Sequence, residues 1–176
     1  MSSDAGYRTL TPDDAPALYD AIVETLDDLK RVCTWPHLPL SVESQRTWLE
    51  QCAEKQARGE RIEYGLFEGD RLLLTTAFTA TGPQEAEVGY WTRRSAQRQG
   101  LTKTAVSTLC TAIFDGTPII HLHAQCNTNN VASRRILESC GFTYTGDKPV
   151  DLPAPEIIAG GYDPCPTRAL YALEQE

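Results

Sequence analysis

The stretch from residue 85 to residue 126 constrains the fold more than any other part of the sequence. Its first part predicts a strand, because apolar side chains alternate at Ala86, Val88 and Tyr90. A helical pattern follows, with apolar residues every four positions at Leu101, Ala105, Leu109 and Ile113. Residues 119–126 then alternate again as a second strand. A strand, a helix and a strand in this order predict two parallel strands lying side by side.

The flanking segments predict the rest of one domain. Before the strand–helix–strand segment we expect a strand at 7–10 and a helix from Thr11-Pro12 with a buried stripe. A loop at 33–40 and a helix from Ser41 follow, and then a hairpin of strands at 62–67 and 71–79. After the strand–helix–strand segment we expect a helix at 130–140, a strand at 142–145, a loop at 149–166 and a strand at 167–173. This order indicates one domain over residues 1–176, of mixed α/β class, with a mostly antiparallel central sheet flanked by helices.

Charge and cysteine content narrow the possible partners. Lys and Arg total 16 against 24 Asp and Glu, a net charge of -8, which disfavours general nucleic-acid binding. The start of the chain lacks the pattern of a signal peptide, and no apolar run approaches the ~20 residues of a membrane span. We therefore expect a cytoplasmic protein with reduced cysteines and no membrane partner, as a monomer or a homodimer.

A basic segment leads into the helix of the central unit. Arg93, Arg94, Arg98 and Lys103 place four positive charges within eleven residues of an acidic protein. The main-chain N–H groups at the start of a helix are unpartnered and bind anions, and Gly100 lets a ligand approach them. This segment is either a phosphate cradle or an ordinary solvated loop.

Two polar residues open the helix at 130–140. Asn130 stands where the helix begins, and Ser133 follows three residues later. Both fit a plain helix cap, and both fit a pair of groups that point at a ligand between two strands.

Three motifs together resemble the GNAT superfamily of acyl-CoA N-acyltransferases, and within it the RimJ/RimL-like branch. They are Gly89-Tyr90-Trp91, then Gln97-Arg98-Gln99-Gly100-Leu101-Thr102, and Asn130-x-x-Ser133-x-x-x-Leu137-x-x-x-Gly141-Phe142. The resemblance covers residues 7–147. The chain departs from the family pattern at Thr102, where a small residue is usual, and at Thr104, where the branch often has Glu.

The resemblance implies a V-shaped gap between the two parallel middle strands, at residues 87–92 and 119–126, that holds acetyl-CoA as co-substrate. The cofactor-binding residues that it implies are Tyr90, Trp91, Thr92, Gln97, Arg98, Gln99, Gly100, Leu101, Thr102, Lys103, Asn130 and Ser133. It implies no metal. His121 and His123 alternate on one strand face, but no third ligand accompanies them.

The reaction implied is transfer of an acetyl group from acetyl-CoA to a primary amine by direct attack, and the branch favours the N-terminal amine of a protein. Two alternatives stay open. One is a small-molecule acetyltransferase acting on a polyamine, an amino acid or an antibiotic. The other is a catalytically silent acyl-CoA-binding or regulatory module, because the last helix has Leu137 and no Tyr where many members place their acid.

Ser133 and Glu87 are the catalytic candidates. Ser133 would donate a hydrogen bond to the leaving sulfur, and Glu87 would act as base through a water, with His37 as the second choice. The acceptor amine would be bound by Trp35, His37, Glu87 and Tyr162, with Leu38 and Trp48 as further apolar walls. The loop at 147–166 would either line the acceptor site or cover an edge of the sheet.

Overall fold

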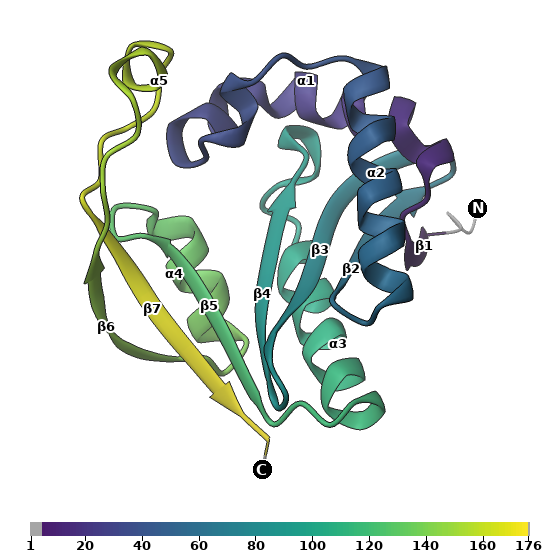
Figure 1. The fold of residues 1–176 in the computed structure, drawn as a ribbon, viewed down its shortest axis with the longest axis vertical. Helices are drawn as coiled ribbons and strands as arrows, with labels where there is room; N and C mark the ends of the chain where they lie inside the picture. The colour runs from purple at the N-terminus through teal and green to yellow at the C-terminus, as the bar shows by residue number, and fades with distance from the viewer. Residues whose placement is uncertain (1–4, 176) are drawn as a thin grey trace.

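The computed structural model describes residues 5–175, and its seven strands form one mixed sheet (Figure 1). The strands are β1 (Ala5–Thr9), β2 (Arg61–Glu68), β3 (Arg71–Gly82), β4 (Glu85–Thr92), β5 (His121–Asn127), β6 (Thr143–Pro149) and β7 (Thr167–Glu174). Their order across the sheet is β1-β2-β3-β4-β5-β7-β6. Of these neighbours only β4 and β5 run parallel, so the predicted fold class is confirmed.

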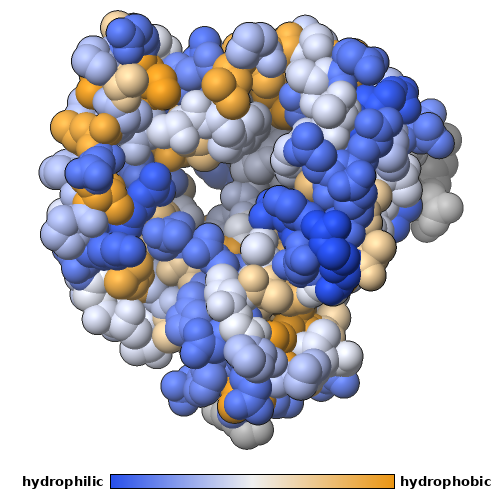
Figure 2. Space-filling view, in the orientation of Figure 1, coloured by the Kyte–Doolittle hydropathy of each residue, from blue (hydrophilic) through white to orange (hydrophobic). Residues whose placement is uncertain are grey.

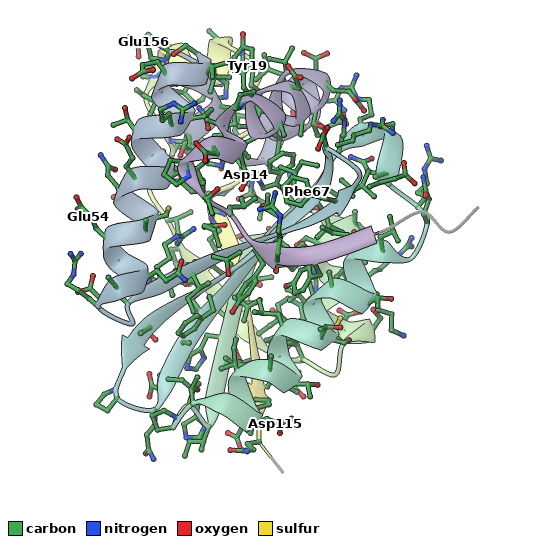
Figure 3. The ribbon with its side chains drawn as sticks, turned by 90° about the vertical axis from the view of Figure 1, so that its right-hand side faces the viewer. Asp14, Tyr19, Glu54, Phe67, Asp115 and Glu156 are labelled. Carbon is green, nitrogen blue, oxygen red and sulfur yellow. The ribbon has the colours of Figure 1, made fainter. Side chains whose placement is uncertain are left out.

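Helices cover both faces of this sheet (Figure 3). The helices are α1 (Ala15–Val32), α2 (Val42–Ala57), α3 (Leu101–Gly116), α4 (Val131–Ser139) and α5 (Pro155–Ala159). Single 3-10 turns stand at Pro12–Asp14, Trp35–His37 and Arg94–Ala96. α1 and α2 lie on one face, and α3 and α4 lie on the other. No helix within residues 5–175 has the length and apolar character needed to cross a membrane.

The alternation of β4 divides its side chains between two cores. Ala86 and Val88 are buried in the core beneath α3 and α4, and Tyr90 packs against it. Trp91 points the other way and packs against the core beneath α1 and α2. The odd-numbered residues of β4 therefore face the side on which α1 and α2 lie.

The parallel strands separate soon after they begin to pair. β4 pairs with β5 only from Glu85 to Glu87, opposite His121 to His123. Beyond Glu87 the two strands diverge as a V, and the space-filling surface is hollowed between the two arms (Figures 1 and 2). This is the V-shaped gap that the family resemblance implied.

The segment between β6 and β7 closes the open end of this V. It was predicted as a loop, and it contains the short helix α5. The main-chain N–H of Asp163 donates to the Arg31 carbonyl at 3.0 Å, and Gly160 lies against the His37 ring. The segment thus joins the arm formed by β5, β7 and β6 to the end of α1.

Candidate active site

The start of α3 lies at the end of β4 and presents main-chain N–H groups. Gly100 is its N-cap, with a φ of 78°, and Arg98 has a φ of 60°. A left-handed backbone at two of three consecutive positions turns the chain sharply into the helix. A Cβ on Gly100 would meet no atom within 4 Å, so the space above this turn is open. The turn has the form of an anion cradle.

Three polar residues of this segment hold the turn in shape. Thr102 shares a hydroxyl hydrogen bond of 2.7 Å with Thr92. The side-chain amide of Gln97 donates to the Thr92 carbonyl at 3.3 Å, and that of Gln99 donates to the Ser95 carbonyl at 2.9 Å. The hydroxyl of Thr102, the departure from the family pattern, therefore ties α3 to the end of β4.

The four cations of the basic segment fall into two pairs. Arg93 binds Glu24 at 2.5 Å and Arg94 binds Asp28 at 2.9 Å, so both are neutralised by α1. Arg98 and Lys103 are exposed and form no ion pair within the described residues. The positive charge that faces a ligand at the cradle thus comes from these two residues and from the helix start.

The start of α4 faces β4 across the gap. The Asn130 side chain accepts a hydrogen bond from the Ser133 N–H at 3.1 Å, so it caps the helix. The Ser133 hydroxyl lies 2.9 Å from the Tyr90 hydroxyl, which also donates to the Ser133 carbonyl at 3.0 Å. Burial raises the pKa of Tyr90 well above its ordinary value, and the Ser133 hydrogen bond opposes this. A neutral phenol therefore stands behind the Ser133 hydroxyl.

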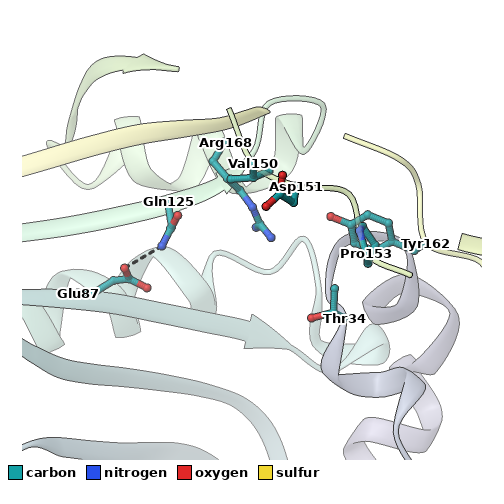
Figure 4. A pocket seen from close by; sticks show the side chains of 8 residues that line it. All are labelled: Thr34, Glu87, Gln125, Val150, Asp151, Pro153, Tyr162 and Arg168. Atoms are coloured by element: carbon teal, nitrogen blue, oxygen red, sulfur yellow. Dashed lines mark hydrogen bonds between the residues drawn. The ribbon is translucent and has the colours of Figure 1, made fainter. Parts of the chain in front are cut away.

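Glu87 lines a cavity of about 450 Å³ at the point where the strands part, here named the Glu87 cavity (Figure 4). Its carboxylate accepts a hydrogen bond of 2.9 Å from the side-chain amide of Gln125 on β5. Arg168 points into the same space from β7, and Thr34 and Tyr162 lie on its far side (Figure 4). The residues that line this cavity therefore come from both arms of the V and from the segment that closes it.

A second cavity, of about 480 Å³, lies between the sheet and the first two helices. Its walls include Trp35, Trp48 and Trp91, which are all the tryptophans of the chain, so it is named here the tryptophan cavity. Trp35 and Trp91 pack with their ring centres 6.5 Å apart. Arg61 and Glu63 of β2 add an ion pair to these walls.

The predicted acceptor residues take different positions. Trp35 lines the tryptophan cavity, whereas Glu87 and Tyr162 line the Glu87 cavity. The Tyr162 hydroxyl is buried against the Asn127 side chain, whose amide donates to it at 3.2 Å. His37 is not among the residues lining either cavity, and its ring lies 3.1 Å from the Lys30 carbonyl, at the junction with α5.

Neither histidine of the β5 pair is among the residues lining the two cavities, although His123 pairs in register with Glu87. His121 is beside Glu174 at 3.6 Å, and His123 is beside Glu85 at 3.7 Å. Within residues 5–175 no three His, Cys, Asp or Glu side chains are placed to hold a metal ion.

Sequence reasoning missed three residues that the fold brings to the site: Glu63, Gln125 and the hydroxyl of Tyr90. Glu63 carried a usable signal, because it shares a strand face with the buried Phe67. A charged residue on an inward face points to a specific partner or a ligand. No local signal pairs Gln125 with Glu87 or Tyr90 with Ser133, because these contacts join separate elements.

Known proteins match this chain over most of its length. Residues 6–143 match the family model of the acetyltransferase (GNAT) domain. A ribosomal-protein-serine acetyltransferase of Escherichia coli (strain K12) is 25% identical over 148 residues, which are 83% of this chain and 80% of that protein.

Solved structures share the fold. One is the RimL ribosomal L7/L12 alpha-N-protein acetyltransferase in complex with coenzyme A, with a TM-score of 0.86, 22% identity, and coverage of 98% of this chain and 95% of that one. Another is the microcin C7 self-immunity acetyltransferase MccE in complex with acetyl-CoA and AMP, with a TM-score of 0.84, 17% identity, and coverage of 98% and 93%. The family match spans the V-shaped gap, the cradle and the start of α4, and it confirms the resemblance found in the sequence. The chain belongs to the GNAT acetyltransferases.

Proposed function

We propose that this acetyltransferase transfers the acetyl group of acetyl-CoA to the N-terminal amine of a protein. The observation that carries the proposal is the separation of β4 from β5 after Glu87. Past that point one edge of β4 has no strand partner within residues 5–175, so its main chain is free to pair with an extended ligand. The pantetheine arm of acetyl-CoA has amide groups that suit such pairing.

The residues along this edge fit the remaining parts of acetyl-CoA. The start of α3, with Arg98 and Lys103 beside it, offers N–H groups and positive charge to a pyrophosphate. Tyr90, Trp91 and Thr92 supply the strand edge. Ser133 lies across the gap, where the thioester end would come.

When bound, acetyl-CoA supplies an activated carbonyl whose carbon–sulfur bond breaks as the amine nitrogen forms its bond to carbon. Glu87, oriented by Gln125, accepts through a water the proton that the attacking nitrogen loses. Ser133, with the Tyr90 hydroxyl beside it, donates a hydrogen bond to the sulfur. The sulfur leaves as a thiolate and is neutralised, through water, by the proton that Glu87 accepted. The two cavities hold the acceptor so that its amine reaches attack distance.

The acceptor class is supported by the likeness to proteins named for acetylating ribosomal proteins. A catalytically silent module is disfavoured by the Tyr90–Ser133 pair, because it supplies the phenol that α4 itself lacks.

The test is thiol release from acetyl-CoA with a panel of amines. The panel contains short peptides with free N-termini, the same peptides with blocked N-termini, and small amines such as spermidine. We expect release with the free peptides and none with the blocked ones. Release with small amines alone would contradict the proposed acceptor, and acetyl-CoA binding without release on any amine would favour the silent module.

A further inference from the structure

A buried carboxylate in the tryptophan cavity has no place in the mechanism above. Glu63 is 4% exposed and stands among aromatic and aliphatic walls. Its carboxylate pairs with Arg61 on the same strand, whose guanidinium also donates to the Thr79 hydroxyl at 2.6 Å. A buried ion pair gives a fold little stability over apolar residues of the same size, so stability alone does not account for this one.

The sheet connects this carboxylate to the strand edge where the reaction takes place. Glu63 pairs in register with Ala77 of β3, and Ala77 pairs with Gly89 of β4. Residues paired in this way lie on the same face, and two antiparallel steps span about 10 Å between Cα atoms. Gly89 stands two residues past Glu87, where β4 has already separated from β5.

The row between Glu63 and the strand edge consists of small residues that line the tryptophan cavity. Ala77 carries only a methyl group, and a Cβ added to Gly89 would meet no atom within 4 Å. Trp91 stands on one side of this row, and Trp35 and Trp48 complete the surrounding walls of the cavity. A chain of several carbons can therefore lie along the row, with one end at β4 and the other at Glu63.

The geometry points to Glu63 as a specificity-determining residue: we propose that it accepts a hydrogen bond from an O–H or N–H donor at the far end of the acceptor's first side chain. The aliphatic part of that side chain packs on Ala77 and between the tryptophans, while the α-amine stays at the edge of β4. This inference rests on the proposed acetyl transfer to N-terminal amines and names the class of N-terminal residue that it selects.

Burial of Glu63 is consistent with this role. Desolvation raises the pKa of Glu63 to about 7, and Arg61 opposes that rise. A ligand donor would replace part of the lost hydration, which is the usual reason for a site to discriminate strongly between acceptors with and without such a group.

The test uses three peptides of identical sequence after the first residue. The first residue is norleucine, 6-hydroxynorleucine or lysine, which share one aliphatic chain and end in a methyl, a hydroxyl or an ammonium group. Because every tryptophan of the chain lines the cavity, quenching of intrinsic fluorescence in the presence of CoA reports binding without any need for turnover. Thiol release with acetyl-CoA is measured in parallel.

We expect the wild-type enzyme to bind at least one donor-ended peptide tenfold or more tightly than the norleucine peptide. A preference shared by the hydroxyl and ammonium peptides would identify any donor as sufficient, and a preference for lysine alone would identify a cation. Glu63→Met should abolish the preference. Glu68→Gln, an exposed carboxylate on the same strand, should keep it.

Equal binding of all three peptides by the wild-type enzyme, or a preference that survives in Glu63→Met, would overturn the assignment. If Glu63→Met does not fold, Glu63→Gln carries the test, and it must weaken binding of the lysine peptide at least fivefold. Thiol release separates the two proposals. Rapid thiol release without a preference among the three peptides would contradict only the role of Glu63. A binding preference without thiol release would contradict only the proposed acetyl transfer.

Discussion

Ser133 has two partners that divide its functions between its main chain and its side chain. Its N–H serves the Asn130 cap, and its hydroxyl contacts Tyr90. Ser133→Ala removes only the second contact, so α4 keeps its cap. We expect turnover to fall about 100-fold, as for the loss of one hydrogen-bond donor to charge that develops in the transition state, with less than a threefold change in CoA affinity. Steady-state kinetics and CoA titration measure the two effects.

The control for this variant is on the same helix. Ser139 is exposed at its other end and donates to the Ile136 carbonyl at 2.8 Å. Ser139→Ala should leave both quantities unchanged. An equal loss of turnover and CoA affinity in Ser133→Ala would make Ser133 a binding residue instead.

Glu63 should make the protein less stable as pH rises. Its pKa is raised to about 7 in the folded protein, against an ordinary value of 4.5 when unfolded. The unfolded chain therefore loses its proton first, and the folded state is penalised progressively between pH 4.5 and 7. Glu63→Gln removes this penalty, so its free energy of unfolding should exceed that of the wild type by about 3 kcal/mol at pH 8 and match it at pH 4. Urea unfolding at both pH values checks this, and a variant less stable at pH 8 would show that the Arg61 pair outweighs desolvation.

Local contacts such as the Asn130 cap could be predicted from the sequence, whereas contacts between distant residues could not. Asn130 fitted both a cap and a ligand group, and the structure shows the cap, which is local and therefore readable from the spacing to Ser133. The contact between Tyr90 and Ser133 spans 43 residues. No spacing rule covers such a pair, because it depends on how β4 and α4 meet across the sheet.

At the scale of elements, the start of α3 is the part on which cofactor binding depends. Gly100→Val places a branched side chain where φ is 78° and the space above is open. The strained backbone costs roughly 1–2 kcal/mol, and the side chain covers the N–H groups. We expect the folded protein to persist and CoA affinity to fall at least 30-fold by calorimetric titration.

Gly59 provides a control that distinguishes backbone strain from obstruction of the N–H groups. Gly59 follows α2, has a φ of 70° and also has no neighbour for a Cβ within 4 Å. Gly59→Val should cost similar stability and leave CoA affinity unchanged. Unchanged affinity in Gly100→Val would refute the cradle.

Glu24 holds α1 to the turn before α3. It binds the Arg93 guanidinium and accepts from the Ser95 N–H at 2.9 Å. Hydrogen bonds from Ser95 and Arg93 lower the pKa of Glu24 to about 2, so its contribution is complete above pH 4.5 and is lost as pH falls from 4.5 toward 2. Glu24→Gln should lower the free energy of unfolding by about 1–2 kcal/mol at pH 7, allowing for its partial exposure. The difference in free energy of unfolding between Glu24→Gln and the wild type should become smaller below pH 4.5, where Glu24 takes up a proton.

Glu54 provides the comparison for this variant. It projects from α2 on the outer side of the molecule (Figure 3) and is exposed. Glu54→Gln should change the free energy of unfolding by less than 0.5 kcal/mol, the usual range for exposed sites. A loss in Glu24→Gln that stays constant down to pH 2 would rule out its charge as the source.

The elements with strong periodicity were predicted well, and the weakly patterned one was not. α1 and α3 have stripes of buried residues at helical spacing, and both form over the predicted residues. α5 has five residues in a segment rich in proline, with no buried residue of its own. Pro155 at its first position and Glu156 in its first turn fit a helix start, but without an apolar stripe they do not distinguish a helix from a loop.

At the scale of the whole molecule, the sheet order was the least predictable feature. The parallel pair follows from the strand–helix–strand order, but the placement of β7 between β5 and β6 inserts the last strand into the sheet. That placement leaves the V open on one side and brings residues 150–166 across its mouth. Sequence reasoning left two roles open for this segment, and its contacts with both arms make it a bridge.

Removing this bridge should affect the acceptor and spare the cofactor. Pro149 pairs with Thr167, and the Val150 N–H donates to the Pro166 carbonyl at 2.9 Å, so a four-residue turn can replace residues 151–164. The replacement deletes Tyr162 and opens the Glu87 cavity, whereas the cradle at Gly100 lies on the other arm. We expect KM for the amine to rise at least tenfold and acetyl-CoA affinity to stay within twofold. Tyr162→Phe keeps the bridge and loses only the Asn127 contact, so it should raise KM less than the replacement of residues 151–164 does. If that replacement also lowered acetyl-CoA affinity, the segment would belong to the cofactor site instead.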